Sequence, residues 1–205
     1  VLELINSDEP ISAASAAALS NKLQQFANGA IYDVSRKVIE LHDEKLEKLE
    51  ELVEAANGSP VLVAYSYKHD LDRIMQKLKA YKPVKLEKPE QIADWNAGKI
   101  KVLVTHPASA GHGLNLQKGG HIVINYDVYF SYALFYQFLR RLARRGQPHH
   151  EVLVYNLLAE ATYDQIVERG CWVDKKNAQN MFFEMIKTLK VKKNGNSQAH
   201  AKNKN

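Results

Sequence analysis

The chain has 205 residues, 45% of them hydrophobic and 25% charged, which suits one globular domain with a buried core. No run of about 18 apolar residues occurs and no basic segment precedes an apolar one at the N-terminus, so neither a membrane span nor a signal peptide is predicted. A single cysteine, Cys171, excludes an intrachain disulfide and a cysteine-built zinc site. The net charge of +5 comes from six lysines, with no acid, from Lys187 onward, so charge alone does not argue for nucleic-acid binding.

The first part of the chain predicts two helices. Residues 12–28 form an alanine-rich stretch that ends at Asn28-Gly29, a pair typical of a helix terminus. Residues 43–56 carry one apolar stripe, made of Leu46, Leu49, Leu52 and Val53. The many acids and lysines of this second helix are interpreted as a solvated face. We therefore expect residues 1–58 to be a helical entry segment.

Short strands and helices alternate from residue 61 onward. Strands are predicted at 61–66, 84–86, 101–105, 121–125 and 152–156. Helices are predicted around 71–78, 92–97 and 132–144, and from 162 to about 187. This alternation favours an α/β domain over residues 59–170, with a central, mostly parallel sheet covered by helices on both faces. A C-terminal helix is expected at 171–190 and a disordered basic tail at 191–205.

The densest cluster of arginines lies at the end of the helix predicted at 132–144. Four of the chain's seven arginines fall between residues 140 and 145. At helical spacing one face carries Phe135, Phe138, Leu139 and Leu142, and the opposite face carries Gln137, Arg141 and Arg144. Cations favour a helix C-terminus for structural reasons, by ~0.3–1 kcal/mol each. Guanidinium groups also suit bidentate recognition of a phosphoryl group, so composition leaves both interpretations open.

A second stretch that could bind phosphate follows the strand at 101–105. It carries hydroxyls at Thr105 and Ser109, and glycines at 111 and 113 that allow a backbone to approach a ligand closely. Such turns often bind phosphates at the start of a following helix. A loop with two glycines is also an ordinary turn, so this stretch alone does not decide between the two readings.

Together these stretches resemble motifs V and VI of the Swi/Snf branch of superfamily-two helicases and DNA translocases, in its bacterial and bacteriophage form. Residues 109–116 match S-A-G-x-G-L-N-L, and residues 137–147 match Q-x-x-x-R-x-x-R-x-G-Q. Residues 61–68 resemble motif IV, and 122–127 the strand between motifs V and VI. The resemblance spans residues 12–170. It implies a RecA-like fold, the second lobe of a P-loop-type motor.

The resemblance also implies roles for individual residues. Arg141 and Arg144 would be arginine fingers that stabilise charge on ATP during phosphoryl transfer. Nucleotide binding is implied for Gln137, Gly111, Gly113 and Asn115. Contacts with the nucleic-acid backbone are implied for Ser66, Lys68, Thr105 and Ser109. Arg140 and Arg145 occupy positions that vary in this family, so backbone contacts and solvated charges are equally open for them.

Two motifs that such a motor needs do not occur in this sequence. There is no G-x-x-x-x-G-K-[ST] loop to hold phosphates and no D-E-x-[HD] run to hold magnesium. We therefore expect ATP with Mg²⁺ to be bound mainly by an N-terminal RecA-like lobe of the same protein, and the isolated chain to be inactive. The implied whole is a helicase or translocase acting on duplex DNA in the cytoplasm of a bacterium or a phage-infected host.

No metal site of the chain's own is expected. The histidine pairs His149-His150 and His106/His112 come without carboxylates or cysteines at ligand spacing. Trp95 and Trp172 have apolar neighbours and are predicted to pack in the core.

Two other functions stay open. One is a module of the same fold that binds nucleic acid without catalysis. The other is a Rossmann-like cofactor enzyme, such as a methyltransferase, that would hold its cofactor at residues 111–115. A glycine-rich turn after the first strand, which that enzyme class uses, is absent from the sequence and counts against it.

Overall fold

The computed structural model describes residues 16–110, 114–128 and 132–169. The chain divides into two compact units, residues 1–165 and 166–205, and of the second only the end of helix α7 (Tyr163–Glu168) is described. The sequence expectations for 1–15 and for 170–205, including Trp172, lie outside the described residues.

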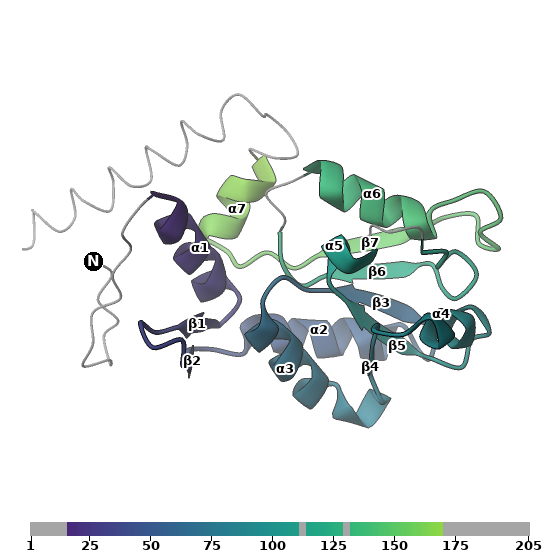
Figure 1. Ribbon diagram of the computed structural model, residues 1–205, viewed down its shortest axis with the longest axis horizontal. Coiled ribbons are helices and arrows are strands. Elements are labelled where there is room, and N and C mark those ends of the chain that lie inside the picture. The colour runs from purple at the N-terminus through teal and green to yellow at the C-terminus, as the bar shows by residue number, and fades with distance from the viewer. Residues whose placement is uncertain (1–15, 111–113, 129–131, 170–205) are drawn as a thin grey trace, which may run out of the picture. The chain divides into compact units, whose positions relative to one another are not determined.

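A five-stranded parallel sheet forms the centre of the first unit (Figure 1). Its order is β4-β5-β3-β6-β7, with β4 at Val84–Lys85, β5 at Val102–Thr105, β3 at Val61–Ala64, β6 at Ile122–Asn125 and β7 at Leu153–Asn156. Ala64, the last residue of β3, pairs with Thr105 on one side and Asn125 on the other. The carboxyl ends of the three central strands therefore meet at one edge, and the predicted α/β fold is confirmed.

Helices cover the sheet from two sides in Figure 1. On one side lie α2 (Glu44–Ala55) and α3 (Lys68–Lys77), and on the other α5 (Pro107–Ala110) and α6 (Tyr132–Leu142). Leu46, Leu49 and Val53 of α2 are buried in one core with alternate residues of the strands, as their spacing predicts. α4 (Pro89–Asn96) precedes β5, and a short 3₁₀ turn spans Lys79–Tyr81.

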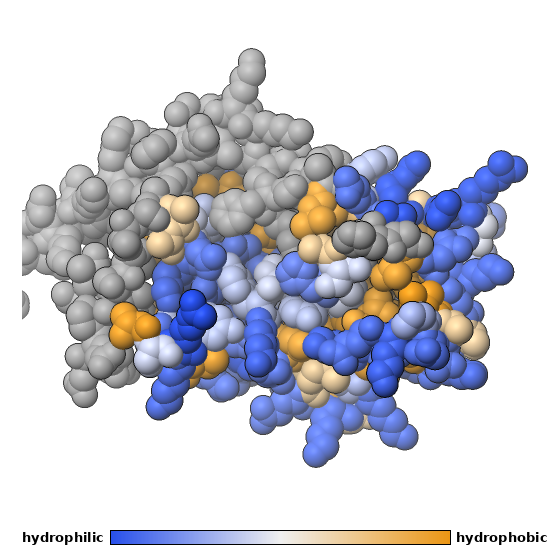
Figure 2. Space-filling model, viewed as in Figure 1, coloured by the Kyte–Doolittle hydropathy of each residue, from blue (hydrophilic) through white to orange (hydrophobic). Residues whose placement is uncertain are grey.

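Strand β7 is more exposed than the central strands of the sheet. It is an edge strand, and Leu153, Val154 and Tyr155 are 39%, 36% and 40% exposed. The sheet nevertheless has helices on both faces, as the sequence predicts, and these exposed side chains belong to its edge. Elsewhere on the face shown in Figure 2, apolar side chains surface only in small areas among hydrophilic ones. None of the described helices is long and apolar enough to cross a membrane.

The entry segment contains a β-hairpin that the helix-only expectation missed. After α1 (Ala16–Ala27), β1 (Ala30–Tyr32) pairs antiparallel with β2 (Val38–Glu40). Asp33 closes the turn because its carboxylate accepts hydrogen bonds from the Ser35 hydroxyl and the Lys37 amide, both at 2.8 Å. Each strand has only three residues, too short for an alternating pattern to show in the sequence.

The charged face of α2 is not wholly solvated, so that interpretation is wrong at one position. Lys45 is only 4% exposed, and its ammonium lies 2.5 Å from the carboxylate of Asp164, which is 1% exposed. Lys48 on the same helix pairs with Glu51 in solvent, as expected. The sequence does not distinguish the two lysines, because Asp164, the partner of Lys45, lies far along the chain.

Candidate functional site

Helix α6 places its apolar side inward and its polar side outward. Phe135, Phe138 and Leu142 are buried, Gln137 is exposed and Arg141 is half-buried. This confirms the predicted phase within the helix. Arg140 is exposed and its guanidinium lies 5.7 Å from the centre of the Tyr136 ring, at cation–π distance.

The helix ends at Leu142, earlier than the predicted 144, and a tight turn follows. The Arg144 amide donates to the Leu142 carbonyl at 3.0 Å, and the Gln147 amide donates to the Arg144 carbonyl at 3.0 Å. Gly146 has φ +96°, a left-handed conformation that favours glycine. Arg144 and Arg145 therefore lie on this turn, and their orientations cannot be taken from helical phase.

The turn that carries Arg144 is bonded to the loop that follows β5. A guanidinium nitrogen of Arg144 donates to Asn115 Oδ1 at 3.4 Å, and the Leu116 amide donates to the Arg141 carbonyl at 3.2 Å. Gln147 Nε2 donates to the carbonyls of Gly120 (3.0 Å) and Leu142 (3.1 Å). The structure thus brings together Arg141, Arg144 and Asn115, which the sequence motifs had only implied to be near each other.

Helix α4 is hydrogen-bonded to this loop. Trp95 is fully buried, which confirms its predicted place in the core, and its Nε1 donates to the Leu116 carbonyl at 2.9 Å. Asn96 Nδ2 donates to the Asn115 carbonyl at 2.7 Å. At Gly119 an added Cβ would lie 2.2 Å from the Trp95 ring, so the loop lies directly on the indole. Asn96 is a supporting residue that sequence reasoning missed, because nothing local marks it.

The residues predicted to contact nucleic acid follow the carboxyl ends of β3 and β5. Ser66 is half-buried, whereas Lys68 at the start of α3 and Ser109 in α5 are exposed. Thr105 is 1% exposed, and its hydroxyl is 3.4 Å from the His106 carbonyl. It would reach a nucleic acid only after a rearrangement, so its contact stays a prediction. Gly111 and Gly113 lie outside the described residues.

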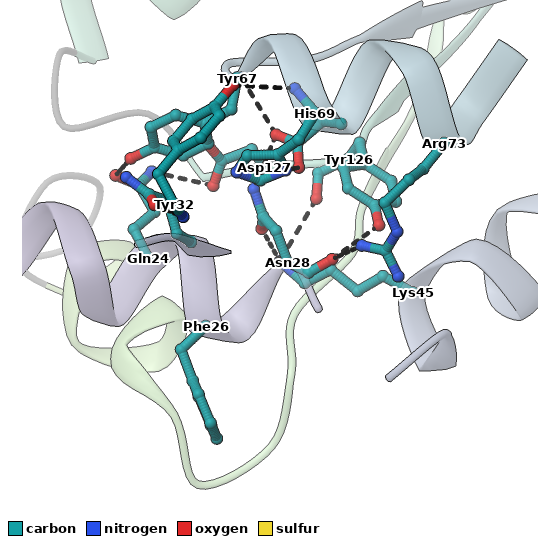
Figure 3. Close-up of polar contacts among 12 residues, drawn as sticks. Gln24, Phe26, Asn28, Tyr32, Lys45, Tyr67, His69, Arg73, Tyr126 and Asp127 are labelled. Atoms are coloured by element: carbon teal, nitrogen blue, oxygen red, sulfur yellow. Dashed lines mark hydrogen bonds and ion pairs between the residues drawn. The ribbon is translucent and has the colours of Figure 1, made fainter. Parts of the chain in front are cut away.

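A buried polar cluster lies beside the same sheet edge, where α1, α2, α3 and the end of β6 meet (Figure 3). Asn28, just after α1, is its centre. Its side chain donates to Asp70 at 3.0 Å and accepts from Lys45 at 2.9 Å, and its carbonyl accepts from Arg73 and Tyr126, both at 2.9 Å. None of these long-range partners could be inferred from sequence spacing.

Asp127 is a fully buried acid beside this cluster. Burial raises its pKa to about 7, with Asp70 and Asp164 adding repulsion. Lys45 and a hydrogen bond from the Ser66 hydroxyl act in the opposite direction. The carboxyl also accepts a 2.8 Å hydrogen bond from Gln24 Nε2. Among the described residues, no group of three or more metal-ligating side chains gathers in a metal-site arrangement.

A known protein family matches the region that contains this sheet and the arginine turn. The model of the helicase conserved C-terminal domain family covers residues 44–146, about half of the chain. The chain belongs to this helicase family. The matched region includes strands β3 to β6, helix α6 and the two arginines of the turn, Arg144 and Arg145.

Solved structures agree with this helicase domain in fold. The C-terminal part of the Fun30 ATPase domain superposes with a TM-score of 0.59 at 18% identity, covering 73% of this chain and 57% of that one. The C-terminal domain of the DEAD-box protein Dbp5 gives a TM-score of 0.50 at 18% identity, covering 63% and 77%. At this identity the likeness establishes the RecA-like fold alone.

A curated relative is more similar in sequence. It is putative protein p41 of Acyrthosiphon pisum secondary endosymbiont phage 1, 39% identical over 186 residues. The match covers 88% of this chain but 40% of the relative, so this helicase domain spans less than half the length of that phage protein.

Proposed function

We propose that this helicase C-terminal domain is the second motor lobe of an ATP-dependent DNA helicase or translocase of the Swi/Snf type. Arg141 and Arg144 act as its arginine fingers. The observation that supports this most is a set of hydrogen bonds. They join the turn that carries Arg144 to the loop that carries Asn115, and they join that loop to Trp95. Catalytic arginines need such support because a fixed charge stabilises a transition state better than a mobile one.

The chemistry follows from the guanidinium group. During phosphoryl transfer negative charge spreads over the transferring group, and a planar, permanently charged donor can bind two of its oxygens at once. ATP with Mg²⁺ is held mainly by an N-terminal RecA-like lobe, because this chain has no phosphate-binding loop and no acidic magnesium motif. Gln137, Gly111, Gly113 and Asn115 are the residues that we propose to bind the nucleotide from this lobe.

Duplex DNA is the proposed track. Ser66, Lys68 and Ser109 follow two adjacent strands of the sheet, so their donors can reach neighbouring phosphates, and buried Thr105 would join them after a rearrangement. The greater length of the phage relative is consistent with a first lobe elsewhere in such a protein. The enzyme would act in the cytoplasm of a bacterium or a phage-infected host.

The test is substitution of the two arginines in a two-lobe protein. Arg144 is exposed and on a turn, so Arg144→Ala should leave the free energy of unfolding within ~0.5 kcal/mol of the parent. Its DNA-stimulated kcat should fall by ~10³–10⁵, as for other arginine fingers, and Arg141→Ala should behave similarly. Arg144→Lys should not restore turnover, because an ammonium lacks the planar fork.

Arg145→Ala is the matched control. Arg145 is the next residue, is also exposed, and has no described contact with Asn115. Its turnover should stay near that of the parent. If Arg145→Ala abolished turnover while Arg141→Ala and Arg144→Ala did not, the assignment of the fingers would be wrong. Unchanged turnover in all three variants would favour a non-catalytic binding module.

A further inference from the structure

Gln24, in the middle of α1, is the side chain that links two functional segments across the domain. It is 4% exposed and lies outside the region matched by the family model. Its Nε2 donates to Asp127 Oδ1 at 2.8 Å and to the Val128 carbonyl at 2.7 Å. Its Oε1 accepts a hydrogen bond from the Tyr67 hydroxyl at 3.1 Å (Figure 3).

Both sets of partners belong to segments with proposed roles. Tyr67 stands between Ser66 and Lys68, the proposed DNA contacts after β3. Asp127 and Val128 lie two and three residues after the end of β6 and precede α6, the helix that bears Arg141. The amide oxygen of Gln24 therefore contacts Tyr67, in the proposed DNA-binding loop. The amide nitrogen contacts Asp127 and Val128, which precede helix α6.

A carboxamide supplies both the donor group and the acceptor that these partners need. The nitrogen faces two acceptors and the oxygen faces a donor, which fixes the orientation of the amide. Burial raises the pKa of the Tyr67 hydroxyl, so it remains a donor at physiological pH. The Ser66 hydroxyl also lowers the pKa of the Asp127 carboxyl, so a DNA phosphate that engages Ser66 changes the surroundings of the same carboxyl that Gln24 contacts.

The backbone of α1 is anchored separately from Gln24. Asn28, at the end of the helix, bonds to Asp70, Lys45, Arg73 and Tyr126. Gln25 bonds to the hairpin, because its Oε1 accepts from the Tyr32 amide at 3.0 Å. Loss of the Gln24 amide therefore leaves these other anchors of α1 in place.

We propose that Gln24 is a positioning residue that couples DNA contact at Ser66 and Lys68 to helix α6, which carries Arg141 and leads into the Arg144 turn. A shift of the Ser66–Lys68 loop on DNA binding moves Tyr67, and the Gln24 amide transmits that shift to Asp127 and Val128. The inference rests on the proposed function and adds a link between the two proposed sites.

The experiment compares Gln24→Ala with Gln25→Ala in a two-lobe protein, measuring ATP turnover with and without duplex DNA. Gln25 is the matched control because it is on the same helix, is 6% exposed and is hydrogen-bonded, but to Asn21 and Tyr32. The ratio of stimulated to basal turnover should fall about tenfold in Gln24→Ala, the order of effect of leaving buried hydrogen-bonding groups without their partner, and stay unchanged in Gln25→Ala. A purely structural role would lower both rates together.

Tyr67→Phe is a milder variant that keeps the ring and removes only the hydroxyl that bonds to Gln24. It should lower the same ratio even if Gln24→Ala folds poorly. A normal ratio in a folded Tyr67→Phe or Gln24→Ala protein would overturn the coupling alone. Absence of DNA stimulation in the unaltered enzyme would overturn both the coupling and the proposed function, so the two failures are distinguishable.

Discussion

Replacing Lys45 by methionine should strongly destabilise the domain. The ammonium of Lys45 uses its three donors on Asp164 at 2.5 Å, Asn28 at 2.9 Å and the Tyr126 carbonyl at 3.3 Å. Methionine keeps most of the buried stem but removes the charge. The carboxylate of Asp164 would then stay buried, with the Ala159 amide (2.9 Å) as its remaining described donor.

The size of the effect follows from the burial of this pair. Removing one partner of a buried ion pair costs about 3–5 kcal/mol, because the other charge is left uncompensated in a medium of low dielectric constant. Domains have about 5–15 kcal/mol of stability in total, so this loss is a large fraction of it. An Asp164→Asn substitution added to Lys45→Met should recover part of the loss, since it removes the uncompensated charge.

Urea unfolding followed by circular dichroism measures the change, with Lys48→Met as the control. Lys48 is on the same helix and also lies 2.5 Å from an acid, Glu51, but the two side chains are 59% and 62% exposed. An exposed pair contributes at most about 1 kcal/mol, and lysine and methionine have similar helix propensities. If the unfolding free energies of the two variants agreed within about 1 kcal/mol, the role assigned to the buried pair would be refuted.

Two further predictions concern Asp127 and Gly119. The pKa of Asp127, about 7 when folded, exceeds the ~3.9 of an unfolded aspartate, so the folded state binds this proton more tightly and loses stability from this group as pH rises from about 4 through 7. Asp127→Asn should flatten that decline in urea titrations at pH 5 and pH 8, and an unchanged slope would contradict the assignment. Gly119→Ala should cost ~1–3 kcal/mol, because its Cβ would meet the Trp95 ring at 2.2 Å. A melting temperature equal to the parent's would show that the loop can move off the indole.

The sequence alone determined the features that depend on local pattern. Runs such as residues 61–64 and 122–125 are continuous and apolar because both faces of a parallel strand are buried, so each strand could be predicted from its own residues. The phase of α6 followed from the spacing of Phe135, Phe138 and Leu142. The motif resemblance then pointed to the helicase family, which the family comparison confirms.

The tertiary structure decided which polar groups meet. Lys45 and Lys48 look alike in the sequence, and only the approach of Asp164 buries the first of them. Gln24 and Gln25 are neighbours, yet one joins two functional segments and the other holds a hairpin. A hydrophobic stripe repeats along one helix and is visible locally, whereas a buried polar group is stable only where a partner from elsewhere satisfies it, so its place depends on the whole fold.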